Sequence, residues 1–311
     1  MSEPTSEPNR DEPTSDRPLA LVTGASGGIG FEMARGLVEH GADVWIVARP
    51  GPRGEEAAQA LRDQAGREAA ATFLPADLSS LAEVRRLAAE AGARLDRLDV
   101  LVHNAGIFVH QRTVTDDGFE KTWAVNHLAP FLLTHLLTER LRAAEAPRVV
   151  VTSSNAERAG AIDLERAASG VPYSAWRAYG WSKQANIHFA RELDRRAPVP
   201  GLRAYAFHPG FVATRFGHEG GGIVGGLIRL TQRLFARDSE AGADTGVWLS
   251  TAEPAPEPSG GYFFDRRVRT PSAPARDEAT GRELWERSEA WVGLSENERW
   301  PAPAAEGGGA G

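Results

Sequence analysis

The chain has 311 residues, no cysteine and a formal net charge of −7 at pH 7. The lack of cysteine excludes disulfides, thiolate metal ligands and thiol catalysis, and the negative charge disfavours nucleic acid and anionic membranes as partners. No apolar run approaches the roughly 20 residues that span a bilayer, and the N-terminus has no secretory leader. We therefore expect a soluble, cytoplasmic protein.

The two ends of the chain differ in composition from the rest. Residues 1–17 combine acids and prolines with almost no apolar side chains, which predicts a disordered tail. Residues 301–311, rich in glycine and alanine, are expected to be a second flexible tail. With 41% hydrophobic residues in the chain, residues 18–300 can bury the core of one domain.

Short apolar runs alternate with segments of helical periodicity between the tails. The runs are predicted strands, at residues 18–24, 42–49, 70–77, 98–106, 147–154, 202–210 and 261–264. The alternation predicts an α/β fold, a doubly wound parallel sheet of about seven strands with helices on both faces. Residues 211–258 are dense in glycine and proline, and we expect a mobile, loop-rich substrate lobe there.

A glycine-rich turn, TGASGGIG, connects the first predicted strand to a helix. Gly24, Gly28 and Gly30 allow the backbone to turn sharply and to approach a pyrophosphate at the positive end of that helix. With Ser26 and Ile29 they form the predicted phosphate site of a Rossmann-type dinucleotide fold. The alternative is an ordinary glycine-rich turn, but the strand–turn–helix context favours a nucleotide.

The second predicted strand ends at Arg49, nineteen residues after Gly30. An acid at this place would bind the ribose 2′-hydroxyl of NAD, whereas an arginine accommodates the 2′-phosphate of NADP. The residue therefore favours NADP (NADPH) over NAD. The alternative is a solvated arginine at the end of a strand.

Tyr179 and Lys183 lie four residues apart in a predicted helix, AYGWSKQANIHFARELDRR. Residues at this spacing share one helix face, so the ammonium can lie near the phenol, favour its ionised form and lower its pKa. A phenol with a lowered pKa would be a useful acid or base. The pair alone occurs by chance in many helices, so the reading needs further support.

That support comes from polar residues at the ends of neighbouring strands. Ser153 and Ser154 follow one strand, and residues 104–106 (Asn-Ala-Gly) follow another at the same carboxyl edge, where open α/β sheets bind ligands. Asn126 interrupts an apolar helix stripe and needs a buried partner. Together with the Tyr179–Lys183 pair, these features at one edge predict a catalytic site.

The ordered set TGASGGIG, NAG, Asn126, TSS, YGWSK and HPG resembles the short-chain dehydrogenase/reductase family over about residues 18–265. VNHLAPFLLT, the stretch around YGWSK and the closing GGYFFDRRVRT segment resemble its retinol dehydrogenase-like members. The resemblance implies an oxidoreductase that interconverts a lipophilic carbonyl and its alcohol. The hydride chemistry would belong to the cofactor.

The resemblance also implies residue roles. Tyr179 would exchange a proton with the substrate oxygen, Ser154 would bond that oxygen, and Lys183 would hold the nicotinamide ribose and lower the Tyr179 pKa. Asn126 would position a water in the relay. Ser153 is the alternative to Ser154 if the strand end shifts by one residue. Further cofactor contacts are implied for Asp77 and Leu78 at the adenine, for Asn104, Ala105 and Gly106, and for Pro209, Gly210, Val212 and Thr214 at the nicotinamide. Asp77 has the alternative role of capping the next helix.

Two features depart from the family pattern. His103 replaces a common asparagine and is read as a packed residue, and the membrane anchor of the animal retinoid enzymes is missing, which puts a membrane-dissolved retinoid in doubt. An apolar substrate pocket could be walled by Tyr173, Trp176, Phe211, Phe216, Ile223, Val224 and Leu227, or these side chains could pack the lobe against the body. The other histidines show no metal-ligand grouping, so no metal is expected. A homo-oligomer is a family expectation only.

Two other functions compete with this reading. A non-catalytic dinucleotide sensor or scaffold could use the same fold, although every proton-transfer residue is retained. A sugar-nucleotide epimerase or dehydratase would share the Tyr/Lys pair, but favours a Gly-x-x-Gly-x-x-Gly loop and a longer C-terminal lobe.

Overall fold

The computed structural model describes residues 17–210 and 239–300. Its sheet has eight strands: β1 (Leu19–Thr23), β2 (Asp43–Ala48), β3 (Ala71–Pro75), β4 (Val100–His103), β5 (Arg148–Thr152), β6 (Arg203–Phe207), β7 (Gly261–Phe264) and β8 (Arg267–Val268). The strand order is β3-β2-β1-β4-β5-β6-β7-β8. Every pair is parallel except β7–β8.

The predicted doubly wound sheet is confirmed, with one strand more than the seven expected. β8 is a two-residue antiparallel return after Asp265 and Arg266, which both have positive φ (51° and 55°). Both residues of β8 are exposed. A strand this short and this exposed carries no apolar pattern, so it cannot be predicted from periodicity.

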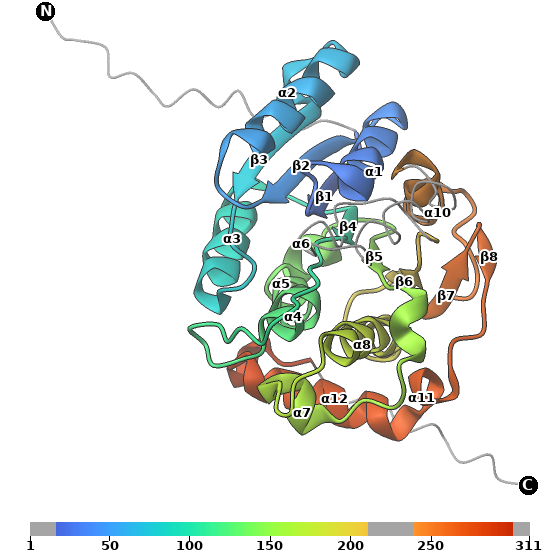
Figure 1. Ribbon diagram of the computed structural model, residues 1–311. Coiled ribbons are helices and arrows are strands. Elements are labelled where there is room, and N and C mark those ends of the chain that lie inside the picture. The colour runs from blue at the N-terminus through green and yellow to red at the C-terminus, as the bar shows by residue number, and fades with distance from the viewer. Residues whose placement is uncertain (1–16, 211–238, 301–311) are drawn as a thin grey trace, which may run out of the picture.

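Helices cover both faces of the sheet (Figure 1). One face carries α1 (Gly28–Glu39), α2 (Pro52–Ala65) and α10 (Ser239–Thr251). The other carries α3 (Leu81–Arg94), α4 (Lys121–Trp123), the π-helical turn η2 (Ala124–Leu128), α5 (Ala129–Leu136), α8 (Ala175–Arg196) and α12 (Glu278–Trp291). Short elements complete the described residues: η1 (Glu68–Ala70), α6 (Thr138–Arg142), η3 (Asn155–Arg158), α7 (Leu164–Ser169), α11 (Ala273–Arg276) and η4 (Glu296–Glu298).

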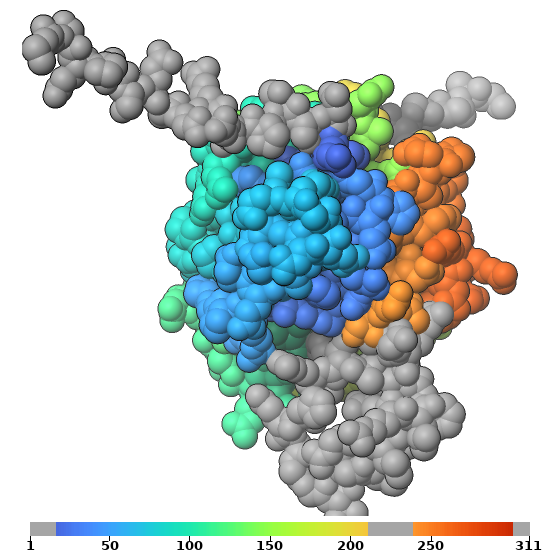
Figure 2. Space-filling model, turned by 90° about the horizontal axis from the view of Figure 1, so that it is seen from above, coloured from blue at the N-terminus to red at the C-terminus, as the bar shows by residue number. Residues whose placement is uncertain are grey.

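The α1 face is packed through small residues. A Cβ on Gly36 of α1 would lie 2.7 Å from the Val247 side chain of α10, and a Cβ on Gly246 would lie 2.4 Å from the Met33 side chain, so each helix packs a side chain against a glycine of the other. Figure 2 shows α10 (orange) directly beside α1 (blue), with α2 in front. α10 is therefore part of the main body.

This packing shows that the loop-rich lobe expected over residues 211–258 does not include all of that range. Residues 239–258 belong to the body, as α10 and the connection that leads to β7, and residues 211–238 lie outside the described residues. The predicted tails 1–16 and 301–311 also lie outside them. Arg17, which we had placed in the first tail, is held by its main chain: Arg97 Nη2 donates to its carbonyl oxygen (2.8 Å).

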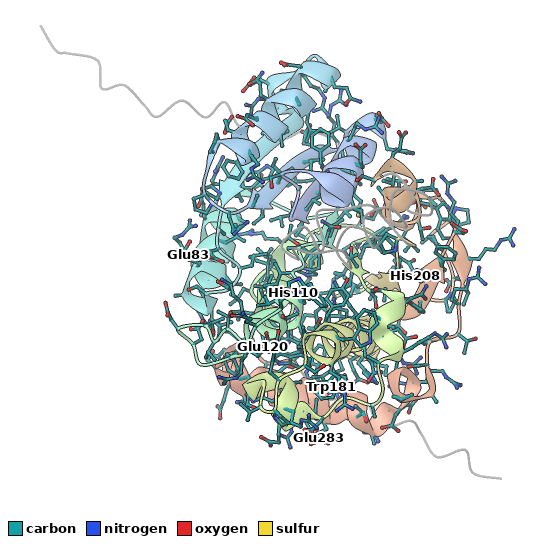
Figure 3. All side chains as sticks on the ribbon, viewed as in Figure 1. Glu83, His110, Glu120, Trp181, His208 and Glu283 are labelled. Atoms are coloured by element: carbon teal, nitrogen blue, oxygen red, sulfur yellow. The ribbon has the colours of Figure 1, made fainter. Side chains whose placement is uncertain are left out.

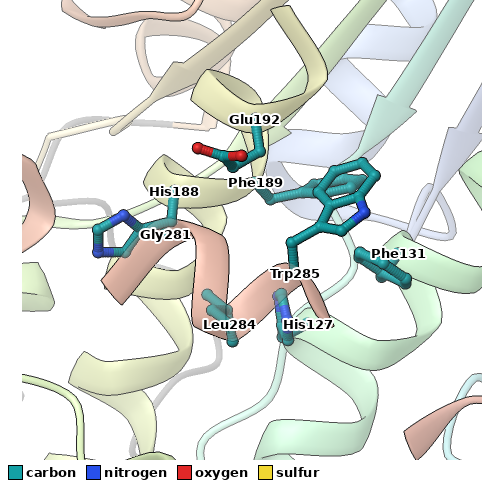
Figure 4. A pocket seen from close by; sticks show the side chains of 8 residues that line it. All are labelled: His127, Phe131, His188, Phe189, Glu192, Gly281, Leu284 and Trp285. Atoms are coloured by element: carbon teal, nitrogen blue, oxygen red, sulfur yellow. The ribbon is translucent and has the colours of Figure 1, made fainter. Parts of the chain in front are cut away.

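The opposite face is rich in aromatic and imidazole rings. Trp285 of α12 reaches toward Phe131 of α5 and Phe189 of α8 (Figure 4), with ring centroids 4.9 and 6.1 Å away. His127 and His188 line the same small pocket as these three rings, and both are almost completely buried. Over residues 17–210 and 239–300, no helix has both the length and the hydropathy to cross a membrane.

Candidate active site

The carboxyl ends of β1, β4 and β5 are tied together by Asn104. Its backbone N–H donates to Thr23 Oγ1 (3.1 Å), and its side-chain amide donates to the carbonyls of Thr23 and Gly24 (both 3.3 Å). Thr152 Oγ1 donates to Asn104 Oδ1 (3.5 Å). The predicted Asn-Ala-Gly segment therefore holds the glycine turn and the end of β5 in one arrangement.

Two glycines of the turn, Gly24 and Gly30, have no room for a side chain. Gly24 has φ +70°, and a Cβ on it would lie 2.7 Å from the Ala105 Cα, while one on Gly30 would lie 2.4 Å from the Gly24 carbonyl oxygen. At Gly27, the N-cap of α1, no side chain caps the helix, and the first turn holds no acid. No side chain of the helix thus occupies the first N–H groups of α1, and its positive N-terminus can bind an anion, which fits a dinucleotide phosphate. Ser26, Gly28 and Ile29 lie in or beside this turn.

Asp77, which follows β3, lies near two basic groups, Arg49 after β2 and Lys121 of α4. Arg49 is exposed directly after β2. Burial alone would raise the pKa of Asp77, but the Ser79 backbone and hydroxyl bonds, with the charges of Lys121 and Arg49, lower it. Asp77 does not cap α3, because Ser80 is the N-cap and accepts from the Glu83 N–H. Leu78 beside it is buried.

Tyr179 and Lys183 lie on α8, whose N-cap is Ser174. Lys183 Nζ lies 5.6 Å from the centre of the Tyr179 ring and donates to the Thr152 carbonyl (3.0 Å). Burial raises the pKa of Tyr179 to about 12, against the opposing effect of its hydrogen bond with Ser154. Burial also lowers the pKa of Lys183 to about 8. The Tyr179 pKa is therefore raised, not lowered as we expected from Lys183: desolvation is the largest cause, and the bond with Ser154 opposes it.

The two serines after β5 have different surroundings. Ser153 is buried and its Oγ donates to the Lys183 carbonyl (2.7 Å). Ser154 bonds the Tyr179 side chain and caps η3, accepting from the Ala156 N–H (3.2 Å). Of the two serines, only Ser154 thus bonds the phenol. The structure therefore favours Ser154 over Ser153 as the residue beside Tyr179.

Asn126 is fully buried in the π-helical turn η2. Its Oδ1 accepts from the Ile107 N–H (2.8 Å), and its Nδ2 donates to the Ile107 carbonyl and to Ser182 Oγ (both 3.0 Å). Ser182 Oγ in turn donates to the Tyr179 carbonyl (2.7 Å). The buried partners that an asparagine in an apolar stripe requires are present, and they connect it to α8.

Some site residues could not be found from the sequence. The sequence analysis did not single out Ser182, which bonds Asn126. Its place directly before Lys183 in a buried helix is the one feature of the sequence that could have indicated it. Phe108 was also missed: its ring lies edge-on to Tyr179, with centroids 5.6 Å apart. The π-helical turn has no sequence signal beyond Asn126 itself.

The remaining predicted residues lie partly inside and partly outside the described residues. Pro209 and Gly210 follow β6 and are partly buried, close to His208, which is labelled in Figure 3. His103 is the packed residue expected: its Nε2 lies 2.7 Å from Thr134 Oγ1, and burial lowers its pKa to about 3. Outside the described residues lie Val212 and Thr214, and with them Phe211, Phe216, Ile223, Val224 and Leu227.

Comparison with known proteins agrees with this geometry. The short chain dehydrogenase family model matches residues 18–220. A candidate daunorubicin C-13 ketoreductase, DnrU, of Streptomyces sp. (strain C5) is 40% identical over 274 residues, which cover 88% of this chain and 92% of that protein. Retinol dehydrogenase 14 of Mus musculus is 36% identical, covering 88% and 85%.

Among solved structures, a blue fluorescent protein from a metagenomic library, in complex with NADPH, superposes with a TM-score of 0.60. It is 28% identical, over 79% of this chain and 94% of that one. Sequence match, fold and the order of the motifs agree. The chain belongs to the short-chain dehydrogenase/reductase family and is similar to its retinol dehydrogenase-like members.

Proposed function

We propose that the protein is an NADPH-favouring oxidoreductase that reduces a lipophilic ketone or aldehyde to its alcohol and can catalyse the reverse reaction. The observation that carries the proposal is the Tyr179 phenol, bonded to Ser154 and flanked by Lys183, at the sheet edge that also holds the glycine turn. A bound nicotinamide would supply the hydride.

The protonation states suit reduction at neutral pH. With a pKa of about 12, Tyr179 is a phenol that can donate its proton to the oxygen of a carbonyl as that oxygen becomes negative. With a pKa of about 8, Lys183 is mostly an ammonium at pH 7. Ser154 bonds the phenol and can bond the same substrate oxygen. Alcohol oxidation requires the phenolate, so its rate should rise with pH.

Asn126 contributes through position. Both polar atoms of its side chain are engaged with Ile107 and Ser182, so we propose that it fixes the segment after β4 against α8. The water-positioning role expected from the family would then fall to its main chain or to a neighbouring group. Lys183 is positioned near the Tyr179 ring by its bond to the Thr152 carbonyl.

The cofactor and substrate classes rest on different observations. Exposed Arg49 would pair with a 2′-phosphate, the α1 N-terminus and Asn-Ala-Gly would hold the rest of the dinucleotide, and the structural neighbour named above contains NADPH. The lipophilic carbonyl follows the relatives named as ketoreductase and retinol dehydrogenase. We further propose a cytoplasmic protein and, from its family, a homo-oligomer.

Replacing Tyr179 with Phe tests the proposal. NADPH oxidation with a panel of ketones and aldehydes should fall by a factor of about 10³ or more, as expected for loss of a proton donor. NADPH binding, measured by titration, should persist. Turnover equal to that of the wild type would contradict the proposal, and tight NADPH binding without turnover of any carbonyl would favour a sensor.

Replacing Arg49 with Ala tests the cofactor preference separately. The affinity for NADPH should drop at least 10-fold, and the affinity for NADH should change little, because only NADPH carries the 2′-phosphate. An equal loss for both cofactors would show that Arg49 does not read the phosphate.

A further inference from the structure

Two segments run outward from the Tyr179 phenol in the same direction. On α8, Lys183 lies one turn after Tyr179 and Trp176 lies three residues before it. After β4, a Cβ on Gly106 would lie 3.2 Å from Lys183 Nζ, and Phe108 packs edge-on to Tyr179 (5.6 Å between centroids). Both segments therefore begin beside Lys183, where the family resemblance puts the nicotinamide ribose, and continue past the phenol.

Beyond the phenol, both segments carry aromatic rings. His110 packs edge-on to Phe108 with centroids 5.1 Å apart, and it lies near the middle of the view in Figure 3. On α8, Trp176 is 59% exposed although tryptophan is the largest apolar side chain. Phe108 is partly exposed and His110 is exposed. Their free faces are thus available to a ligand.

A hydrogen bond fixes the spacing of the two segments. The Tyr173 hydroxyl donates to the Val109 carbonyl, between Phe108 and His110 in the chain. Tyr173 precedes the N-cap of α8, so the bond connects the outer end of one segment to the outer end of the other. The bond holds the main chain between Phe108 and His110 beside the start of α8, and a pre-positioned segment binds a partner at a smaller entropic cost.

We propose that Phe108, His110 and Trp176 form an aromatic subsite that selects carbonyl substrates carrying a planar aromatic ring a few bonds from the reacting carbon. The inference rests on the proposed function for the position of the reacting oxygen. The carbonyl oxygen lies at Tyr179 and Ser154, and the ring extends away from Lys183 between the two segments, where edge-to-face and stacked contacts are available.

A matched pair of ketones tests the subsite. 4-Phenylbutan-2-one and 4-cyclohexylbutan-2-one share the same unconjugated carbonyl and differ in whether the ring is aromatic. For the wild type, kcat/KM should favour the phenyl ketone by about 3- to 10-fold, as expected for one or two aromatic contacts. In F108L and W176L, which keep an apolar side chain, the ratio should move toward one. The control V268A, which trims a 52% exposed valine on β8, should leave the ratio unchanged.

Calorimetric titration of both ketones into the protein saturated with NADP⁺ gives a readout that needs no turnover. Tighter binding of the phenyl ketone in the wild type, lost in F108L or W176L, supports the subsite even if neither ketone is reduced. Equal kcat/KM values and equal affinities for the two ketones would overturn it and leave the proposed function intact. Failure of every carbonyl to oxidise NADPH would instead count against the proposed function.

Discussion

The two faces of the sheet are built from different side chains. The fully buried residues that α1, α2 and α10 contribute are small or aliphatic, such as Met33, Leu37 and Leu61. On the other face, α5, η2, α8 and α12 bury Phe131, Trp285 and several histidines. Of the catalytic candidates, Asn126 lies in η2 and Tyr179 and Lys183 lie on α8, all on this second face, while Ser154 follows β5.

The difference shows how one sheet can serve two needs. The first face allows the backbone to come close, which the glycine turn requires, and it depends little on pH. The second face holds polar groups away from water in fixed partnerships, which positions a proton donor but makes the core sensitive to protonation. The following changes should separate these two behaviours.

Acid should break the second face first. Burial lowers the pKa of His103 and His127 to about 3, and of His135 and His188 to about 4, from 6.5. Because the unfolded chain then binds protons first, stability is complete above pH 6.5 and falls as the pH drops toward the folded values. Between pH 7.5 and 5.5 the loss should reach up to about 5 kcal/mol, at about 1.4 kcal/mol for each histidine.

Urea unfolding at several pH values measures this loss. In a His188→Gln variant the slope of stability against pH should shrink by about a quarter, because one of four protons is removed. A free energy of unfolding that is the same at pH 7.5 and 5.5 would contradict the assignment of four neutral, buried histidines.

On the first face, Gly30 of the glycine turn should tolerate no side chain. In Gly30→Ala the new Cβ would lie 2.4 Å from the Gly24 carbonyl and 2.3 Å from Asn104 Nδ2, so the turn must open. We expect at least about 100-fold weaker NADPH binding, or about 3 kcal/mol.

Gly92→Ala is the matched control: it lies in α3 with nothing within 4 Å of its Cβ. It should keep the cofactor affinity and add about 0.5–1 kcal/mol of stability. Wild-type affinity in the Gly30 variant would show that close backbone approach is unnecessary.

A pair of buried serines compares the faces at the level of one hydroxyl. Ser288 of α12 bonds His127 Nε2 (2.9 Å), whereas Ser250 of α10 bonds the Gly246 carbonyl of its own helix (2.8 Å). Ser288→Ala leaves a buried imidazole nitrogen without its partner and should lower the free energy of unfolding by about 1–2 kcal/mol. Ser250→Ala should change it by less than about 0.5 kcal/mol. Equal effects in urea unfolding would remove the distinction.

The parts of the fold that the sequence predicts are those fixed locally. The strands, the glycine turn and the Tyr179–Lys183 face follow from periodicity and helix geometry. The glycine and proline content of residues 211–258 predicts a loop-rich lobe, but α10 lies within that range. Its Gly246 is there for close contact with Met33 and Phe207, a tertiary reason that composition does not reveal.

The sequence predicts a set of candidate site residues, of which the fold brings Ser154, Tyr179 and Lys183 together, but it does not predict their electrostatics. The direction of the Tyr179 shift depends on how many atoms surround the phenol compared with how near the ammonium lies, and only the folded structure supplies both. The π-helical turn around Asn126 likewise depends on partners, Ile107 and Ser182, that lie far away in the sequence.

The central claim is that this chain moves a hydride between NADPH and a carbonyl carbon. The direct measurement uses NADPH carrying deuterium at both C4 positions, with mass spectrometry of the alcohol formed from 4-phenylbutan-2-one. We expect consumption of NADPH and one deuterium on the carbinol carbon, with loss of product in Tyr179→Phe. An alcohol without deuterium, or tightly bound NADPH with no alcohol from any ketone or aldehyde, would contradict the claim.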